Sequence, residues 1–207
     1  MSLLDRAFGA VYDPGMRGTE RAGLGAKRRE LLAGLRGDVV EIGAGTGANL
    51  EHLGAEVERA TLLEPNRYLA ARLRDRVSHL GVRAERQVGE APAEALPLPV
   101  ESVDAVVATL VLCSVDDLPR ALAEIHRVLR PGGTLVLIEH VAAEGALGTA
   151  QRALAPAWSV VARGCQLHRD IGSAVADAGF DVTHVASWRL PGGGPAGPAI
   201  AGVARRP

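Results

Sequence analysis

The sequence predicts an α/β fold with a mixed, mostly parallel sheet and helices on both of its faces. Two observations support this prediction. Short apolar runs alternate with amphipathic helical patterns over residues 19–140, as in parallel sheets that helices cover on both sides. Two later apolar segments, 181–187 and 199–204, are joined by a loop without a helix, so we expect them to be antiparallel neighbours that close the sheet.

The expected strands are short, mostly apolar segments bounded by turn residues or by the end of a helical pattern. In chain order they are 38–43, 60–65, 82–88, 103–112, 133–140, 181–187 and 199–204. Residues 82–88 alternate only weakly, which is typical of an outer strand, whereas residues 103–112 are strongly apolar. The pattern therefore predicts seven strands.

The expected helices have apolar residues spaced three or four apart. In chain order they are 19–36, 46–53, 66–80, 116–130, 146–163 and 168–178. The clearest is 116–130, which Pro131 and the two following glycines break. We expect Asn66 and Asp116 to cap the third and fourth helices, Gly81 to end the third, and Pro156 to kink the fifth.

Composition and charge limit the classes of function. The net charge is −1 and no basic stripe is present, so we expect no nucleic-acid partner. Arg28 and Arg29 lie on a helical pattern beside acidic residues, where a solvated face explains them. The sequence has neither a signal peptide pattern nor the roughly 20 apolar residues of a membrane-spanning helix. We therefore expect one cytoplasmic domain over residues 1–207, as a monomer or homodimer.

The stretch EIGAGTGAN, residues 41–49, places three glycines between a strand and a helix, where the backbone can approach a ligand closely. Glu64 lies 21 residues after Gly43, at the end of the next strand, and can accept both hydroxyls of a ribose. Gly43, Gly45 and Ala48 also satisfy a loose dinucleotide fingerprint. From this loop alone, NAD(P) and S-adenosylmethionine (SAM) both stay open.

The downstream segments favour SAM. ALPLPVESVDAVVATLVLCSV (95–115) and EIHRVLRPGGTLVLIEH (124–140) resemble, in order and spacing, motifs of the class I SAM-dependent methyltransferases. NAD(P) oxidoreductases lack that set, so they become the weaker alternative. The resemblance implies a Rossmann-like class I methyltransferase fold with a seven-stranded mixed sheet and an antiparallel final strand.

A narrower resemblance is to the methyltransferase-like thiol S-methyltransferases. The similar segments are TLVLCSV (109–115), IEHV (138–141), APAW (155–158), GCQLHR (164–169) and GPAIAGVA (197–204). They imply a small, largely apolar acceptor, with a thiol as the first choice. O-, N- or C-methylation in quinone or secondary-metabolite biosynthesis and a non-catalytic SAM-binding protein stay open. Animal members carry an N-terminal anchor that the printed sequence lacks, so we expect no integral membrane segment.

The resemblance also assigns contacts to SAM. The glycine loop would hold its methionine moiety, the Glu64 carboxylate its ribose, and residues after the second to fourth strands its adenine. The expected cofactor-binding residues are Tyr12, Glu41, Gly43, Ala44, Gly45, Gly47, Asn49, Glu64, Pro65, Asn66, Ala93, Glu94, Thr109 and Leu110. Residues 1–36 would form a helical lid, 37–140 the SAM-binding half, and 141–207 the acceptor side with the closing hairpin.

His140 is the expected catalytic residue, because it follows the fifth strand and can act as a general base near neutral pH. Methyl transfer from a sulfonium needs no enzyme nucleophile, and Asp116 and Asp117 disfavour a thiolate nearby, so we interpret Cys113 as a packing residue.

Trp158, Leu154 and His168 are the expected acceptor contacts, in a segment that would cover the acceptor. Cys165 and His168 lie close in sequence but have no acids at ligand spacing, so we expect no metal.

Overall fold

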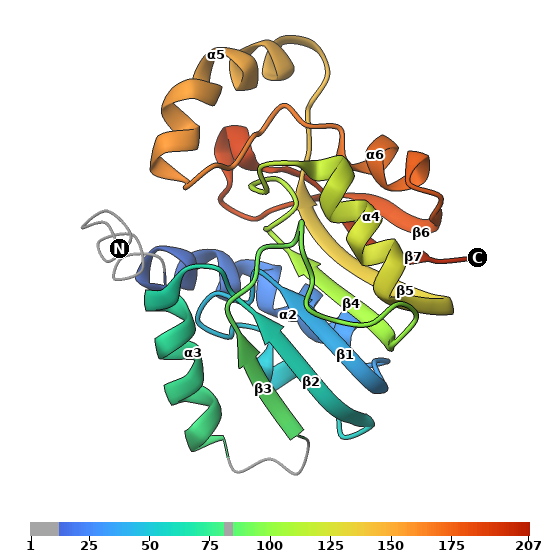
Figure 1. Cartoon of the computed structure of the whole chain (residues 1–207). Coiled ribbons are helices and arrows are strands. Elements are labelled where there is room, and N and C mark those ends of the chain that lie inside the picture. Colours follow the sequence, from blue (N-terminus) through green and yellow to red (C-terminus); the bar gives the residue numbers. More distant parts are fainter. Residues whose placement is uncertain (1–12, 81–84) are drawn as a thin grey trace.

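The computed structural model describes residues 13–80 and 85–207, built around a seven-stranded sheet (Figure 1). The strands are β1 Gly37–Ile42, β2 Val57–Leu63, β3 Glu85–Gly89, β4 Val103–Thr109, β5 Leu129–His140, β6 Asp181–Arg189 and β7 Pro198–Arg205. Their order is β3-β2-β1-β4-β5-β7-β6. Neighbours from β3 to β5 are parallel, and β7 is antiparallel to β5 and β6. The predicted mixed sheet and its antiparallel closing pair are confirmed.

Strand ends differ from the prediction where the backbone turns. β4 ends at Thr109 rather than 112, because Leu110 has a φ of 57° and leaves the extended conformation. β5 begins at Leu129 rather than 133, and its pairing with β4 shifts register around Pro131. Residues 82–84, and Gly81 as a helix end, lie outside the described residues.

The helical segments follow the predicted order. They are a stretch from residue 13 to 19, a π-helix η1 Glu20–Leu24, α2 Gly25–Leu32, a 3₁₀-helix η2 Leu50–His52, α3 Arg67–His79, α4 Leu118–Val128, α5 Gly145–Val161, α6 Ile171–Asp177 and a 3₁₀-helix η3 Gly194–Ala196. The helix predicted over 46–53 is wrong, since that stretch forms turns and only the short η2. The predicted cap Asn66 is confirmed, as its side chain accepts from the N–H groups of Tyr68 and Leu69.

The cap of α4 is Asp117 rather than the predicted Asp116. The Asp117 carboxylate accepts from the Arg120 N–H at 3.0 Å, and Pro119 stands in the first turn. The Asp116 N–H instead donates to the Glu94 side chain. Pro119 lacks an N–H that the first turn of the helix would leave unpaired anyway.

Helices cover both faces of the sheet and also its carboxyl end. α4 and α6 pack on one face through Leu122, Ile125 and Val175, and α2 and α3 contribute Leu32 and Leu73 to the other. α5 lies beyond the carboxyl ends of the strands, above the sheet in Figure 1. Strand order reverses between β1 and β4, so a ligand crevice is expected there, below α5.

Candidate active site

The glycine loop follows β1 at the carboxyl end of the sheet. Gly43, Gly45 and Gly47 have φ values of 60°, 57° and 87°, which glycine adopts without strain. A Cβ on Gly43 would strike Val111, and one on Gly47 would strike Leu50 and Leu73. A Cβ on Gly45 would meet nothing within 4 Å, so the loop leaves open space above its central glycine.

Glu64, directly after β2, has a carboxylate that the backbone orients. Its Oε2 accepts from the Gly45 N–H at 2.9 Å and its Oε1 from the Asn66 N–H at 2.8 Å. The side chain is buried, and burial raises its pKa against the lowering effect of these two bonds. A carboxylate oxygen has more than one acceptor site, so both oxygens can still accept from a ligand's hydroxyls.

A buried polar network lies beneath the loop. The Arg28 Nη1 donates to the Asn49 Oδ1 and to the Thr109 hydroxyl, both at 2.8 Å. The Asn49 amide donates to the Glu41 Oε1 at 2.9 Å and to the Thr109 hydroxyl at 3.0 Å. Glu20 accepts from the Arg28 Nε at 3.1 Å. The network joins α2 to the ends of β1 and β4.

Arg28 corrects the sequence-based interpretation. It was expected on a solvated face, but its exposed fraction is 3%, whereas Arg29 is exposed. The helical spacing could have indicated that Arg28 is buried, since Arg28 lies four residues after Leu24 and four before Leu32, both of which are buried. An arginine inside an apolar stripe indicates a buried polar partner.

Glu41 has an unsatisfied oxygen. Its Oε2 is buried and has no hydrogen-bond partner among the described residues. Burial, partly opposed by Asn49 and Arg28, raises the pKa of Glu41 to about 7. Buried polar atoms are nearly always paired, so this oxygen is suited to a ligand that brings a donor, such as an ammonium group.

Comparisons with known proteins agree with this geometry. Residues 40–137 match a methyltransferase domain family. Human thiol S-methyltransferase TMT1A is 35% identical in an alignment 184 residues long that covers 81% of this chain and 75% of that protein. The chain belongs to the class I SAM-dependent methyltransferases. It is therefore an enzyme of methyl transfer, and SAM is the cofactor that its family implies.

Two further similarities are weaker. Phosphatidylethanolamine N-methyltransferase of Cereibacter sphaeroides is 32% identical over 120 residues, 58% of this chain and 59% of that protein. A SAM-dependent methyltransferase from Thermotoga maritima, described as a possible histamine N-methyltransferase, has a TM-score of 0.70 at 24% identity and covers all of both chains. That structure supports the Rossmann-like methyltransferase fold alone.

The residues at the carboxyl end of β1, β2 and β4 fit SAM. The open space above Gly45 gives room for the methionine moiety, and the unpartnered Glu41 Oε2 suits its ammonium group. Glu64 presents a carboxylate that the backbone already orients toward this edge of the sheet. Ala44, Gly47, Asn49 and Thr109 lie in or under the same loop, so the structure brings together most of the residues that the sequence assigned to the cofactor.

Other predicted cofactor residues are less enclosed. Pro65 is exposed, and Leu110 is half-buried beside Thr109. Ala93 is buried, but the Glu94 carboxylate already accepts from the N–H groups of Asp116 and Asp117. The contacts of these residues with an adenine stay predictions. Tyr12 lies outside the described residues.

Glu139, near the end of β5, holds the turn that follows β4. Its carboxylate is fully buried and accepts from the N–H groups of Val111, Leu112 and Cys113 at 2.9 to 3.1 Å. Burial raises the pKa of Glu139, against the lowering effect of these bonds. The residue was missed from sequence, because an acid at the end of an apolar strand does not reveal which backbone groups it will meet.

His140 lies among sulfur atoms. Its Nδ1 is 3.6 Å from the Cys113 Sγ and 3.5 Å from the Cys165 Sγ, and its Nε2 is buried without a partner among the described residues. Hydrogen bonds with Cys113 and with His140 lower the pKa of Cys165, whereas the hydrogen bond with Cys165 and burial raise the pKa of Cys113. Cys113 is 1% exposed, and it packs with Trp158 and Leu167 as well as Cys165. The predicted packing place of Cys113 is confirmed, but its polar neighbours were not foreseen.

The three residues predicted to contact the acceptor do not all lie in the same place. Trp158 packs against the cluster that Cys113 and Cys165 form with Leu167 and Ala196, and its indole nitrogen is buried without a partner in the described chain. The side chain of Leu154 is 45% exposed, and His168 is exposed as well. The structure thus brings Trp158 close to His140, while Leu154 and His168 lie toward solvent.

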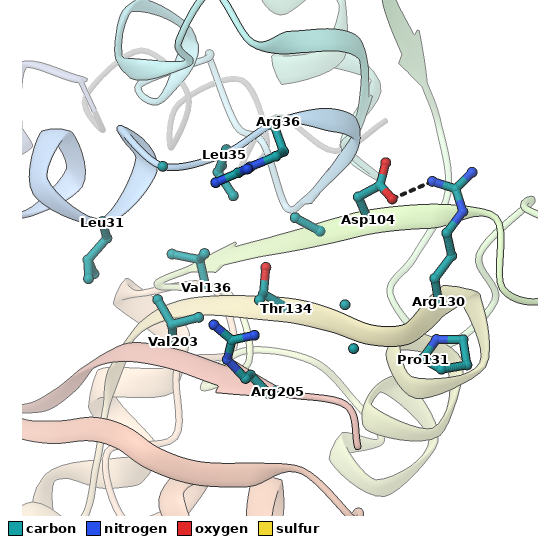
Figure 2. Close-up of a pocket in the computed structure, with 14 residues that line it drawn as sticks. Leu31, Leu35, Arg36, Asp104, Arg130, Pro131, Thr134, Val136, Val203 and Arg205 are labelled. Carbon is teal, nitrogen blue, oxygen red and sulfur yellow. Dashed lines mark ion pairs between the residues drawn. The ribbon is translucent and has the colours of Figure 1, made fainter.

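A cavity of about 460 Å³ lies elsewhere (Figure 2). Leu31, Leu35 and Arg36 line one side, and the early residues of β4 and β5 line the other, with Asp104 paired to Arg130. These residues stand toward the amino ends of the parallel strands. Ligands of such sheets bind outside the carboxyl ends, so we do not assign this cavity to the active site.

Proposed function

We propose that this methyltransferase methylates the sulfur of a small, largely apolar thiol. What supports the acceptor class is the similarity to human thiol S-methyltransferase TMT1A, which extends over 81% of this chain and so beyond the SAM-binding half. The apolar surroundings of His140, with Trp158 packed beside the two cysteines, suit an acceptor of low polarity. Among the described residues, no helix combines the length and the apolar content needed to cross a membrane.

The chain's main task in this reaction is alignment. When bound, SAM supplies an electrophilic methyl group on a sulfonium centre. Glu41 would hold the ammonium group at one end of the cofactor, and Glu64 the ribose at the other. Fixing both reactants in one geometry can lower the barrier by about 7–11 kcal/mol. The two carboxylates, oriented by Asn49 and by backbone N–H groups, are suited to that task.

A thiol acceptor makes small demands on a base. With a reference pKa of ~8.5, about a tenth of a thiol is already ionised near pH 7.5. An alcohol would need a base far more. The role of His140 as general base stays a prediction.

A lid is part of the proposal. Asp13, at the first described position, accepts from the Thr46 hydroxyl at 2.6 Å and from Arg72 at 2.8 Å. These bonds tie the N-terminal helical segment to the glycine loop and to α3. We propose that residues 1–36 cover SAM, that 37–140 bind it, and that 141–207 form the acceptor side.

A matched acceptor panel tests the function. Benzyl mercaptan, benzyl alcohol and benzylamine differ only in the nucleophilic group, and phenol adds a more acidic hydroxyl directly on the ring. With labelled SAM near pH 7.5, we expect the mercaptan to turn over at least tenfold faster than the others. A Gly45→Ala variant serves as the control with weakened SAM binding. Turnover of the amine or the phenol without any thiol turnover would instead support N- or O-methylation, in line with the weaker similarity to an N-methyltransferase.

A further inference from the structure

Three atoms that can bind a metal ion lie close together at the carboxyl end of the sheet. The Cys113 Sγ, the Cys165 Sγ and a ring nitrogen of His140 all lie within 4.8 Å of one another, and all three residues are buried. They come from three separate segments: the turn after β4, the end of β5 and the loop after α5. Their proximity therefore does not follow from closeness in sequence.

Hydrogen bonds can pair these three side chains only two at a time. The His140 Nδ1 lies at nearly equal distances from two sulfurs, 3.5 Å and 3.6 Å. A ring nitrogen has either one hydrogen or one lone pair, so it serves one of these sulfurs at a time, while the Cys113 Sγ also has the Ser114 hydroxyl at 3.5 Å. A cation at the centre satisfies all three atoms at once.

The distances match a tetrahedral zinc site. Zinc binds thiolate sulfur at about 2.3 Å and imidazole nitrogen at about 2.0–2.1 Å. Tetrahedral angles then place a sulfur and a nitrogen ligand about 3.6 Å apart. Both observed sulfur–nitrogen distances agree with that value. Thiolate and imidazole ligands also select zinc over magnesium or calcium.

The surrounding backbone holds the ligands in place. The Gln166 N–H donates to the Cys113 carbonyl at 2.8 Å, and Arg169 donates to the Leu112 carbonyl at 3.0 Å. The Glu139 carboxylate fixes the Cys113 N–H. These bonds join the loop that carries Cys165 to the turn that carries Cys113, so the site is largely preformed.

We propose that Cys113, His140 and Cys165 bind a zinc ion whose fourth position takes the acceptor thiol. Within the described ranges no other histidine, cysteine or acid joins the three, and Glu139 is already engaged by three backbone N–H groups. Three protein ligands with one open position are typical of catalytic zinc. The role for the acceptor rests on the proposed function, whereas the metal site does not.

The chemistry balances without a further reactant. The acceptor thiol loses its proton to solvent when its sulfur binds the metal. The sulfur then forms a bond to the methyl carbon while the bond from that carbon to the SAM sulfur breaks. The products are a neutral thioether and S-adenosylhomocysteine. An imidazole that ligates through Nδ1 keeps its hydrogen on Nε2, so in this scheme His140 is a metal ligand and not the general base.

Cobalt titration of the reduced full-length protein tests the site. We expect one Co²⁺ per chain, with the absorption of thiolate-to-cobalt charge transfer, and its displacement by Zn²⁺. Cys113→Ser, Cys165→Ser and His140→Gln should each lose at least tenfold in Co²⁺ affinity. His168→Gln is the matched control, since this exposed histidine is the one nearest to Cys165 in sequence, and it should bind Co²⁺ within twofold of the native protein. SAM binding by calorimetry verifies that each variant is folded.

The outcomes separate the two proposals. Absence of stoichiometric Co²⁺ binding, or equal loss in His168→Gln, overturns the metal site. Stoichiometric binding with a cobalt spectrum that benzyl mercaptan does not change overturns the fourth position for the acceptor. Undiminished thiol turnover by zinc-free protein overturns the zinc role and leaves the proposed function standing. Metal binding without any thiol turnover leaves the metal site and overturns the proposed function.

Discussion

The Glu41 carboxylate is held by a single hydrogen bond from Asn49, and its second oxygen is buried and unpartnered. Its pKa is about 7, against an ordinary value of 4.5, because burial disfavours the charged form. A buried acid with a raised pKa contributes most stability below its unfolded pKa and loses that stability as the pH rises through its folded pKa. Folding therefore favours the protonated form of Glu41, whereas binding of an ammonium group favours its charged form.

Glu41→Gln should stabilise the free protein at pH 8 and weaken SAM binding. Glutamine resembles the protonated acid, so the gain in free energy of unfolding should approach about 3 kcal/mol at pH 8 and fall below about 1 kcal/mol at pH 5. Urea unfolding at both pH values measures this, and calorimetry measures the loss of SAM affinity. An equal change in stability at both pH values would show that Glu41 does not titrate in this window.

Arg28→Met should destabilise the protein by about 3 kcal/mol, because it removes the donor that Glu20, Asn49 and Thr109 share in a buried site. Arg29→Met is the matched control, since Arg29 is exposed on the same helix, and it should change stability by less than about 0.5 kcal/mol. Denaturant unfolding of both variants at pH 7 gives the comparison. Similar values for the two would contradict the buried network.

At the level of elements, the glycine loop gives two contrasting substitutions. Both Gly43 and Gly45 have a positive φ, so alanine costs about 1 kcal/mol of backbone strain at either position. At Gly43 the new Cβ also strikes Val111, whereas at Gly45 it enters open space. Gly43→Ala should therefore lose more stability, while Gly45→Ala should stay folded and lose at least tenfold in SAM affinity. Thermal unfolding and calorimetry on both variants test this, and unchanged SAM affinity in Gly45→Ala would place the cofactor elsewhere.

Helices with a strong local pattern of apolar residues could be predicted from the sequence, and those with a weak pattern could not. The helix around Leu122 and Ile125 has a full apolar stripe and was found with nearly correct ends. The stretch 46–53 has a helical pattern too weak to overcome the three glycines beside it, and it forms turns and η2. The cap of α4 was missed by one residue, because Asp116 and Asp117 offer the same side chain and only the tertiary contact with Glu94 separates them.

At the scale of the whole molecule, the sequence predicted the position of the crevice but not the side chains that meet beside it. Strand order and the carboxyl-end rule place Gly45 and Glu64 at one edge, and both could be found from spacing. Cys113, His140 and Cys165 belong to three segments whose contact depends on how the loop after α5 returns to the sheet. No local pattern records that return, so the sequence analysis considered only Cys165 with His168 and expected no metal.

The assignment of SAM predicts a change in the stability of the whole chain. A ligand that binds only the folded state at 100 times its Kd stabilises it by about 2.7 kcal/mol. For a chain of 207 residues, that should raise the Tm by about 5–10 °C. Thermal unfolding with SAM or S-adenosylhomocysteine should show this shift, and NADH at equal concentration should show none. Glu64→Gln should lose at least half of the shift, because its amide NH₂ replaces one of the two accepting oxygens and would face the N–H of Gly45 or Asn66. A shift of the Tm with NADH and none with SAM would show that the glycine loop binds a dinucleotide and not SAM.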